Sequence, residues 1–182
     1  QAWIPWPRAR YQPNAAQKYR TIGVSITRDL ERIPYPRMAL APDEDDPPGV
    51  DFDRMMSIKV PGGYVGLVRV GRYIVDPVKG KTEFPHECQL AFSRDARTWS
   101  RPAGRESVLG VGEPGKWDEF LITPANPIQV GDDIYILYQA GQGETRRGIG
   151  LATLKRDRWA AIEPTHIHGV LQTQPMAWAN RR

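Results

Sequence analysis

The chain has 182 residues, of which 40% are apolar and 25% charged, and its 25 basic and 21 acidic side chains give a net charge of +4. This is the composition of a globular protein with one sizeable core, so it excludes an intrinsically disordered chain. No apolar run approaches the roughly 18 residues that a membrane span needs, so we expect no membrane partner.

The positive charge is spread along the chain, whereas the acidic residues cluster in DEDD, residues 43–46. A nucleic-acid-binding protein usually concentrates its basic residues on one face, so no nucleic acid is expected as a partner. The first ten residues, QAWIPWPRAR, contain neither an initiator methionine nor a signal-peptide pattern, which predicts a processed form or a fragment. Cys88 is the single cysteine, so no intrachain disulfide forms and the redox compartment is left open.

Short apolar runs separated by 17 glycines and 17 prolines predict an all-β chain of many short strands and turns. Three of these runs end in the related segments TRDLERI, SRDARTW and KRDRW. Their aspartates, Asp29, Asp95 and Asp157, lie 66 and 62 residues apart. A repeat of about that length fits a four-stranded antiparallel unit with its loops.

We interpret the repeated aspartates as turn residues whose carboxylates accept hydrogen bonds from nearby backbone N–H groups. Ser93, two residues before Asp95, is replaced by Thr27 and Lys155 in the other copies, which suits a structural position better than a nucleophile. No histidine recurs beside it, so a serine–histidine catalytic pair has no support.

Two hairpins with glycine-containing turns are predicted in chain order, MMSIKV–PGG–YVGLVRV at residues 55–70 and NPIQV–GDD–IYILYQA at residues 126–140. Third strands are expected at 89–93 and 148–154, and fourth strands at 99–102 and 159–162. The run IYILYQA is apolar on both faces, which predicts sheets covered on both sides, as in the blades of a β-propeller. A double β-sandwich is the rival fold, but the repeat is harder to explain in that fold.

The chain resembles the five-bladed propeller glycosidases of the arabinanase, invertase and levansucrase group. The resemblance lies in the order of the segments RTIGVSITRDLERI, PDEDD, DFDRMMSI, LAFSRDARTWSRP, GKWDEFLI, GDDIYILYQAG and RGIGLATLKRDRWAAI, which cover nearly the whole chain. Within them, SRDARTWSRP resembles the Asp-box turn of sialidases, with Ala96 where a glycine is commoner. The resemblance implies an oligo- or polysaccharide partner, catalysis by paired carboxylates without a cofactor, and an extracellular or periplasmic location.

A five-bladed propeller with this repeat needs about 320 residues. The resemblance therefore implies an incomplete β-propeller of four-stranded antiparallel blades, with about two and a half to three blades present. We expect a blade remnant at about 1–40, blades at about 51–103 and 118–163, and a C-terminal extension at 164–182 that resembles the start of a β-sandwich. Because a partial propeller leaves strand edges and apolar faces uncovered, the expected protein partner is the remainder of the propeller or another copy of the chain.

Acidic residues recur where each innermost strand of such a propeller begins, and these strand starts converge at the propeller axis. Asp51 lies 22 residues after Asp29, and Asp118 lies 23 residues after Asp95. Glycoside cleavage requires two carboxyl groups that flank one bond, so Asp51, Asp118 and Glu119 are the predicted catalytic residues. The alternative is that these acids are solvated loop residues or hydrogen-bond their own turns.

Substrate binding is predicted for the neighbouring residues Asp53, Arg54, Trp117, His86 and Glu87. Trp117 offers an apolar face to a sugar ring, and Arg54 is suited to hydrogen-bond hydroxyl groups or a carboxylate. His86 and Glu87 belong to a longer loop at the rim of the site.

Two further patterns are interpreted as uninformative. Glu87-Cys88 matches the Glu-Cys pair that carries the acid/base glutamate of invertase-type enzymes, but here it opens a third strand, so we take the match as coincidence. His166 and His168 lie two residues apart without a third ligand nearby, so no metal site is expected.

The leading hypothesis is a glycan-active, glycoside hydrolase-like propeller. The second is a non-catalytic propeller that binds carbohydrate or protein through the same axial mouth. Nucleic-acid binding is the third, and it predicts strongly salt-dependent association.

Overall fold

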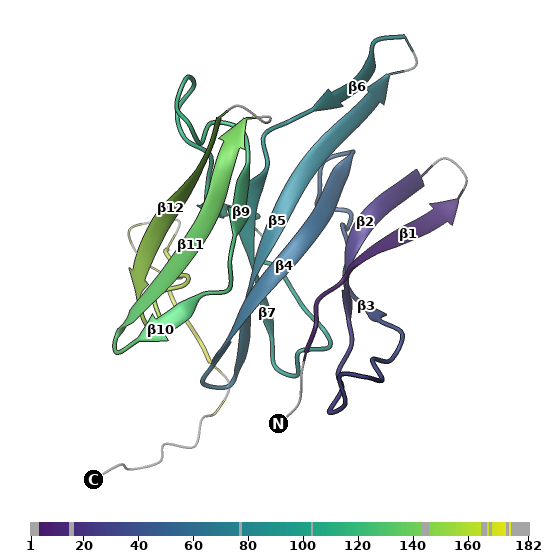
Figure 1. Cartoon of the computed structure of the whole chain (residues 1–182). Helices are drawn as coiled ribbons and strands as arrows, with labels where there is room; N and C mark the ends of the chain where they lie inside the picture. The colour runs from purple at the N-terminus through teal and green to yellow at the C-terminus, as the bar shows by residue number, and fades with distance from the viewer. Residues whose placement is uncertain are drawn as a thin grey trace.

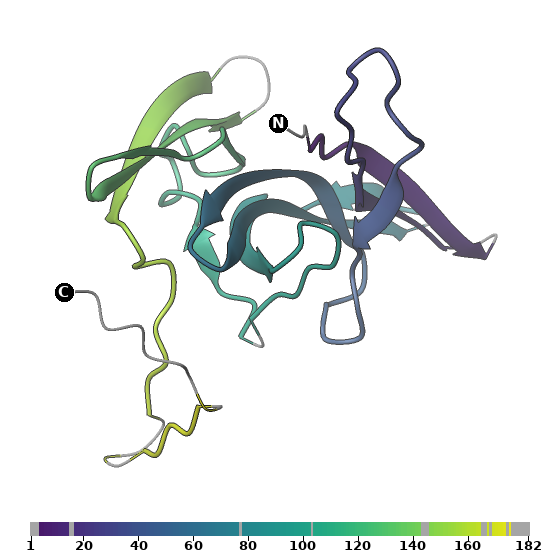
Figure 2. The same ribbon diagram turned by 90° about the horizontal axis from the view of Figure 1, so that it is seen from below.

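The computed structural model describes residues 4–14, 17–76, 78–102, 104–142, 146–164, 167, 169–173 and 175. These residues form twelve strands in three antiparallel sheets, which lie side by side without closing into a ring (Figures 1 and 2). The predicted all-β, antiparallel fold class is therefore confirmed. The described residues include no helix, and so none that is long and apolar enough to cross a membrane.

The three sheets follow one another along the chain. The first contains β1 (Arg8–Asn14), β2 (Gln17–Val24) and β3 (Arg37–Leu40). The second contains β4 (Val50–Val60), β5 (Gly63–Asp76), β6 (Gly80–Glu83), β7 (Glu87–Ser93) and β8 (Ser107–Leu109). The third contains β9 (Ile122–Pro124), β10 (Ile128–Val130), β11 (Asp133–Gln142) and β12 (Arg146–Lys155).

Both predicted hairpins are confirmed. Val60 pairs with Gly63 across the β4–β5 turn, where Gly62 has a φ of 83° that an L-amino acid rarely adopts. Val130 pairs with Asp133 across the β10–β11 turn. The paired register then continues along β4 and β5 to the far end of the second sheet, where β4 begins.

The second sheet is buried on both faces. Val68 and Val70 of β5 pack with Ile22 of the first sheet, whereas Val65 and Leu67 pack against the third sheet. Successive side chains of a strand point to opposite faces, so one strand supplies both cores. The expectation of a sheet covered on both sides is confirmed for this sheet.

The third sheet differs, because its outer face is open among the described residues. Ile134 and Ile136 of β11 are buried, but Leu137 is 46% exposed and Ile149 of β12 is 79% exposed. The two-faced apolar pattern of IYILYQA is present, yet only one face has a neighbouring sheet. Past Lys155 the described residues form no further strand, and the chain leaves the third sheet (Figure 2).

The expected fourth strands are only partly present. In the second sheet, Ser100 forms a single bridge with Phe92, and the regular fourth strand is β8, at 107–109. In the third sheet, residues 159–162 form no strand. Trp159 instead packs into the core between the second and third sheets, so its segment is fixed by side-chain burial rather than by a strand ladder.

The predicted turn at SRDARTW is confirmed. The carboxylate of Asp95 accepts hydrogen bonds from the backbone N–H groups of Arg97 (2.8 Å) and Thr98 (2.9 Å). Trp99 is buried and donates its indole N–H to the carbonyl of Ala96. These backbone hydrogen bonds hold the pKa of Asp95 below its ordinary value, as expected for an ionised turn residue.

Candidate functional site

The β1–β2, β5–β6 and β11–β12 hairpins turn at the same end of the molecule, the upper end in Figure 1, which we call the hairpin end. Residues of these hairpins and of the strands between them line two grooves. The sheet 1–2 groove, with a volume of about 420 Å³, is lined by Arg8, Arg10, Tyr19, Arg20, Asp51, Tyr73 and Lys81. The sheet 2–3 groove, with a volume of about 380 Å³, has a lining that includes Arg54, Arg69, Glu83, Leu121, Thr123 and Arg147.

Asp53 lies at the base of this end because β4 contains a bulge. Phe52 pairs with Val70 and Arg54 with Arg69, so Asp53 is the extra residue on its strand. The change of register turns Asp53 toward the arginines of neighbouring strands while keeping the apolar residues of β4 in the core.

Three arginines hold the carboxylate of Asp53. Arg8 and Arg20 donate to Oδ1 at 2.6 and 2.7 Å, and Arg69 donates to Oδ2 at 2.7 Å. Burial alone would raise the pKa of Asp53, but the hydrogen bond from Arg8 and the charges of Arg69 and Arg20 outweigh it and hold the pKa low. Asp53 is therefore an ionised anchor and is unsuited to donate a proton.

Asp51 lies two residues earlier and lines the sheet 1–2 groove. Its Oδ2 accepts from Nε of Arg20 at 2.6 Å, and its Oδ1 accepts from the backbone N–H of Arg20. Arg20 thus bridges Asp51 and Asp53, and fixes the start of β4 to β2. A carboxylate held this way presents its remaining lone pairs to a ligand in the groove.

A second chain of contacts runs from Asp53 through Arg69 to His86 and Glu83. Nη2 of Arg69 lies 2.8 Å from Nδ1 of His86, and because arginine only donates, Nδ1 accepts and the ring proton sits on Nε2. That nitrogen lies 2.9 Å from Oε1 of Glu83. Burial first, and then the charge of Arg69, lower the pKa of His86 to about 4, so the ring is neutral.

His86 is 1% exposed and lies beneath the surface of the hairpin end. Its ring packs edge-on against Tyr73 and over Phe120, and a Cβ added at Gly71 would lie 2.8 Å from its Nε2. The close approach of ring and backbone requires glycine at position 71. Through Arg69 and Glu83, His86 orients groups that reach the sheet 2–3 groove.

The third sheet begins differently from the second. β9 starts at Ile122, four residues after Asp118, so no acidic residue opens this strand. Ile122 pairs with Ala140 as Phe52 pairs with Val70, and Thr123 pairs with Gln139 as Arg54 pairs with Arg69, so the bulge residue Asp53 has no counterpart in the third sheet. The backbone of His86 bonds to Phe120 and Ile122, and these bonds tie the second sheet to the third.

Asp118 and Glu119 lie in the turn before β9, outside the lining of both grooves. The carbonyl of Asp118 accepts from the N–H of Gly112, and the carboxylate of Glu119 accepts from the N–H of Gly115. Trp117 stacks on Tyr138, with ring centroids 6.0 Å apart. The structure therefore brings together Asp51, Asp53, Arg54 and His86, but not the group from 117 to 119.

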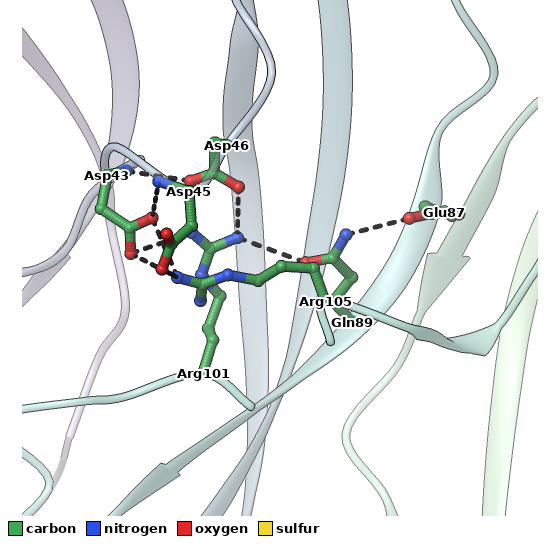
Figure 3. Close-up of polar contacts among 7 residues, drawn as sticks. All are labelled: Asp43, Asp45, Asp46, Glu87, Gln89, Arg101 and Arg105. Atoms are coloured by element: carbon green, nitrogen blue, oxygen red, sulfur yellow. Dashed lines mark hydrogen bonds and ion pairs between the residues drawn. The ribbon is translucent and has the colours of Figure 1, made fainter. Parts of the chain in front are cut away.

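Glu87 belongs to a separate network that anchors the loop between β3 and β4 (Figure 3). It accepts a hydrogen bond from Gln89, whose Oε1 lies 3.2 Å from Arg101. Arg101 is 1% exposed and pairs with Asp46.

Arg105 holds the same loop at a second point (Figure 3). Arg105 donates to Asp43 at 2.7 Å, and the guanidinium carbon of Arg101 lies 4.6 Å from the ring centroid of Phe52. The acidic cluster at 43–46 is thus a loop anchor immediately before Asp51. We call this set of residues the loop network, and the contacts of Asp51 and Asp53 the groove network.

Four site residues were not predicted from the sequence: Arg8, Arg20, Arg69 and Glu83. Arg69 offers the clearest signal, since it is a charged residue inside the apolar strand YVGLVRV. His166 and His168 lie outside the described residues. Within the described ranges, no three His, Cys, Asp or Glu side chains are grouped to hold a metal ion.

No family model matches the chain, and no curated protein matches it. Among solved structures, one titled "Glycoside hydrolase" is similar to it with a TM-score of 0.59 and 18% identity, over 89% of this chain and 42% of that one. Another, a complex described by the names BT0996 and RGII, has a TM-score of 0.57 and 20% identity over the same shares. The chain spans less than half of either structure, and at these identities the likeness shows the fold alone. A glycosidase-like all-β fold was the coarser part of the predicted resemblance, and the likeness supports it.

Proposed function

We propose that the chain forms part of a glycan-active β-propeller that is related to glycoside hydrolases. In this proposal its ligand site lies at the hairpin end. The observation that carries the proposal is the placement of Asp51 and Asp53 at the start of β4, with Asp51 lining a groove of about 420 Å³. The likeness in fold to a structure titled "Glycoside hydrolase" supports a saccharide as the ligand.

In this proposal Asp51 is the catalytic base or nucleophile, and Asp53 keeps the arginines in place. A second carboxyl group has to donate the proton to the leaving oxygen. Asp118 and Glu119 are the sequence candidates for that role, and Glu83 is the structural one. Asp51 pairs with Gly71 and Glu83 with Tyr73, so the two acids flank β5 from opposite edges. Asp51 lines the sheet 1–2 groove, and Glu83 lines the neighbouring sheet 2–3 groove.

One observation favours a second candidate function, the binding of carbohydrate without hydrolysis. A general acid needs a raised pKa, whereas the pKa of Asp53, the buried carboxyl group of the site, is held low by three arginines. A site with stable carboxylates and arginines binds sugar hydroxyl groups well without cleaving them.

The test uses the longest natural polypeptide that contains this chain, with aryl-glycosides and natural oligosaccharides as substrates. Asp51→Asn is expected to lower kcat/KM at least 100-fold, because an amide neither carries the charge nor accepts the proton. Glu83→Gln, Asp118→Asn and Glu119→Gln identify the proton donor by the same loss. Asp95→Asn is the matched control and keeps full activity in the folded fraction. Full activity of Asp51→Asn would overturn the assignment, and saccharide binding without turnover in the unmutated protein would favour the second function.

The open face of the third sheet is proposed to be covered by a further sheet of the same propeller, and in the isolated chain by a second copy. Leu137, Ile149 and Leu151 give this face an apolar surface. We expect the isolated chain to self-associate in sedimentation, and the double variant Ile149→Lys, Leu151→Lys to shift it toward monomer. Thr98→Lys, at an exposed position on the turn of the second sheet, is the control. A compact monomer of the unmutated chain at high concentration would contradict the proposal.

A further inference from the structure

The sheet 1–2 groove is lined mainly by cationic side chains. Four of the side chains that line it are cationic, Arg8, Arg10, Arg20 and Lys81, and one is a carboxylate, Asp51. The whole chain has a net charge of only +4. Because Arg8 and Arg20 are paired with Asp51 and Asp53, the positive charge left for a ligand in this groove is mainly that of Arg10 and Lys81.

Two arginines in this groove directly oppose each other. Arg10 of β1 pairs with Arg20 of β2 in the strand register, and Arg8 lies on the same face two residues away. Like charges at directly opposite positions destabilise an antiparallel pair. Arg20 is compensated by Asp51 and Asp53, but among the described residues no hydrogen bond or ion pair compensates Arg10.

Lys81 is the second cation of the groove that can still bind an anionic group. It is 57% exposed in its side chain, and its nearest carboxylate oxygen, on Glu83, is 3.9 Å away. Its ammonium group lies 3.9 Å from the ring centroid of Tyr73, and the guanidinium of Arg20 lies over the same ring at 4.9 Å. Tyr73 thus holds the two cations at the groove, since a cation over an aromatic face is attracted to it.

The remaining lining suits a sugar. Asp51 offers a carboxylate to hydroxyl groups, and Tyr19 offers aromatic surface and a hydroxyl group beside the cations. The groove volume of about 420 Å³ is within the usual range for a small-molecule site. A nucleic-acid strand would instead be expected to follow an extended basic stripe.

We propose that the sheet 1–2 groove binds an acidic sugar residue, with Arg10 and Lys81 contacting its anionic group and Asp51 and Tyr19 facing its ring. The inference rests on the proposed function, and it adds the substrate class. The anionic group is a carboxylate, as in a uronic acid, or a sulfate ester, and both offer the oxygens that a guanidinium binds.

The test is isothermal titration calorimetry of the full chain with three probes of equal length: a galacturonic acid trisaccharide, a neutral galactose trisaccharide and its sulfated form. We expect the carboxylated or the sulfated probe to bind at least tenfold tighter than the neutral one, and the tighter of the two identifies the anionic group. Arg10→Gln and Lys81→Gln should each weaken that binding at least tenfold. Lys59→Gln, which removes an exposed charge at the other end of β4, should leave it unchanged.

A thermal melt supplies a second readout. Arg10→Gln removes the Arg10–Arg20 repulsion, so it should keep or raise the Tm of the free protein while reducing the rise in Tm caused by the acidic probe. A loss of binding that accompanies unfolding would overturn the assignment of Arg10 as a ligand contact.

The failures of the two proposals are distinguishable. Tighter binding of the neutral probe, unaffected by Arg10→Gln, would overturn the acidic-sugar inference and leave the glycan function standing. Binding of a short DNA oligonucleotide in place of all three saccharides would overturn both.

Discussion

The groove network and the loop network are built from the same residue types, arginines and aspartates, and they differ in how far their central ion pairs are exposed to solvent. In the loop network, Arg101 and Asp46 have side chains that are 1% and 4% exposed, so the pair is closed to solvent. In the groove network, Arg8 is 49% exposed and Arg10 opposes Arg20 across the strand pair. The first network fastens a loop, and the second keeps charge available for a ligand.

The two networks contain the same residue types, so residue type does not separate a structural ion-pair cluster from a candidate site. The burial of the charged side chains, and the extent to which each is paired with an opposite charge, do. Both networks border β4: the loop network holds the segment before it and packs on Phe52, and the groove network starts at Asp51. The loop network therefore positions the start of β4, and with it the groove network. Damage to the loop network should appear as lost stability, and damage to the groove network as lost ligand binding.

The largest expected effect separates two buried arginines. Arg101→Met leaves the buried carboxylate of Asp46 without its partner, and breaking such a pair typically costs about 3–5 kcal/mol. Arg69→Met leaves Asp53 with Arg8 and Arg20, so its cost should be clearly smaller. Urea unfolding of both variants measures the difference. Equal losses would mean that the two networks are equally structural.

An intermediate effect is expected in the pH dependence of the unfolding free energy. It arises from His86, which contacts Arg69 of the groove network. The pKa of His86 is about 4 in the folded chain and about 6.5 when unfolded, so between these values the unfolded state binds more protons. The contribution of the neutral His86 ring to the free energy of unfolding is therefore fully present above about pH 6.5, and it is lost as the pH falls toward 4. Its size is roughly 2 kcal/mol once solvent screening is allowed for.

The charged groups around the His86 ring are Arg69, Glu83, Arg20 and Asp53. The control for the pH prediction is therefore His86→Phe, which keeps a ring at the site and removes the titrating group. Its unfolding free energy should depend less on pH between 6.5 and 4 than that of the unmutated chain. Identical pH dependence in both proteins would show that other groups cause the loss. Asp53, whose pKa is lowered, adds a separate loss at still lower pH.

The smallest effect is expected for a carboxylate outside both networks. Asp95→Asn removes a charge that accepts two backbone hydrogen bonds on the surface of the turn, so Tm should fall slightly. Glycan binding should not change. Differential scanning calorimetry and the saccharide titration measure the two quantities, and a loss of binding at unchanged Tm would place Asp95 in a ligand site.

The sequence by itself determined the features that depend on near neighbours. The hairpin at 55–70 follows from alternating apolar residues around Pro61 and Gly62, and the turn at Asp95 follows from a carboxylate placed two residues before free backbone N–H groups. The same local pattern located Asp51 and Asp53 at the beginning of a strand, because the strand start is also a local feature.

Only the tertiary structure decided which residues the carboxylates of Asp51 and Asp53 contact. Arg20 and Asp51 are 31 residues apart in the chain, and Arg8 and Asp53 are 45 apart, so their contacts depend on how the first sheet packs against the second. It also decided that β9 begins at Ile122, which leaves Asp118 in a turn although its spacing from Asp95 matches that of Asp51 from Asp29. A spacing counts residues, but the length of the loop before a strand is set by packing, and here the backbone contacts of His86 with 120–122 fix the strand start. For the same reason the apolar pattern of β11 specified two faces able to be buried, and only the arrangement of the sheets determined which face is covered.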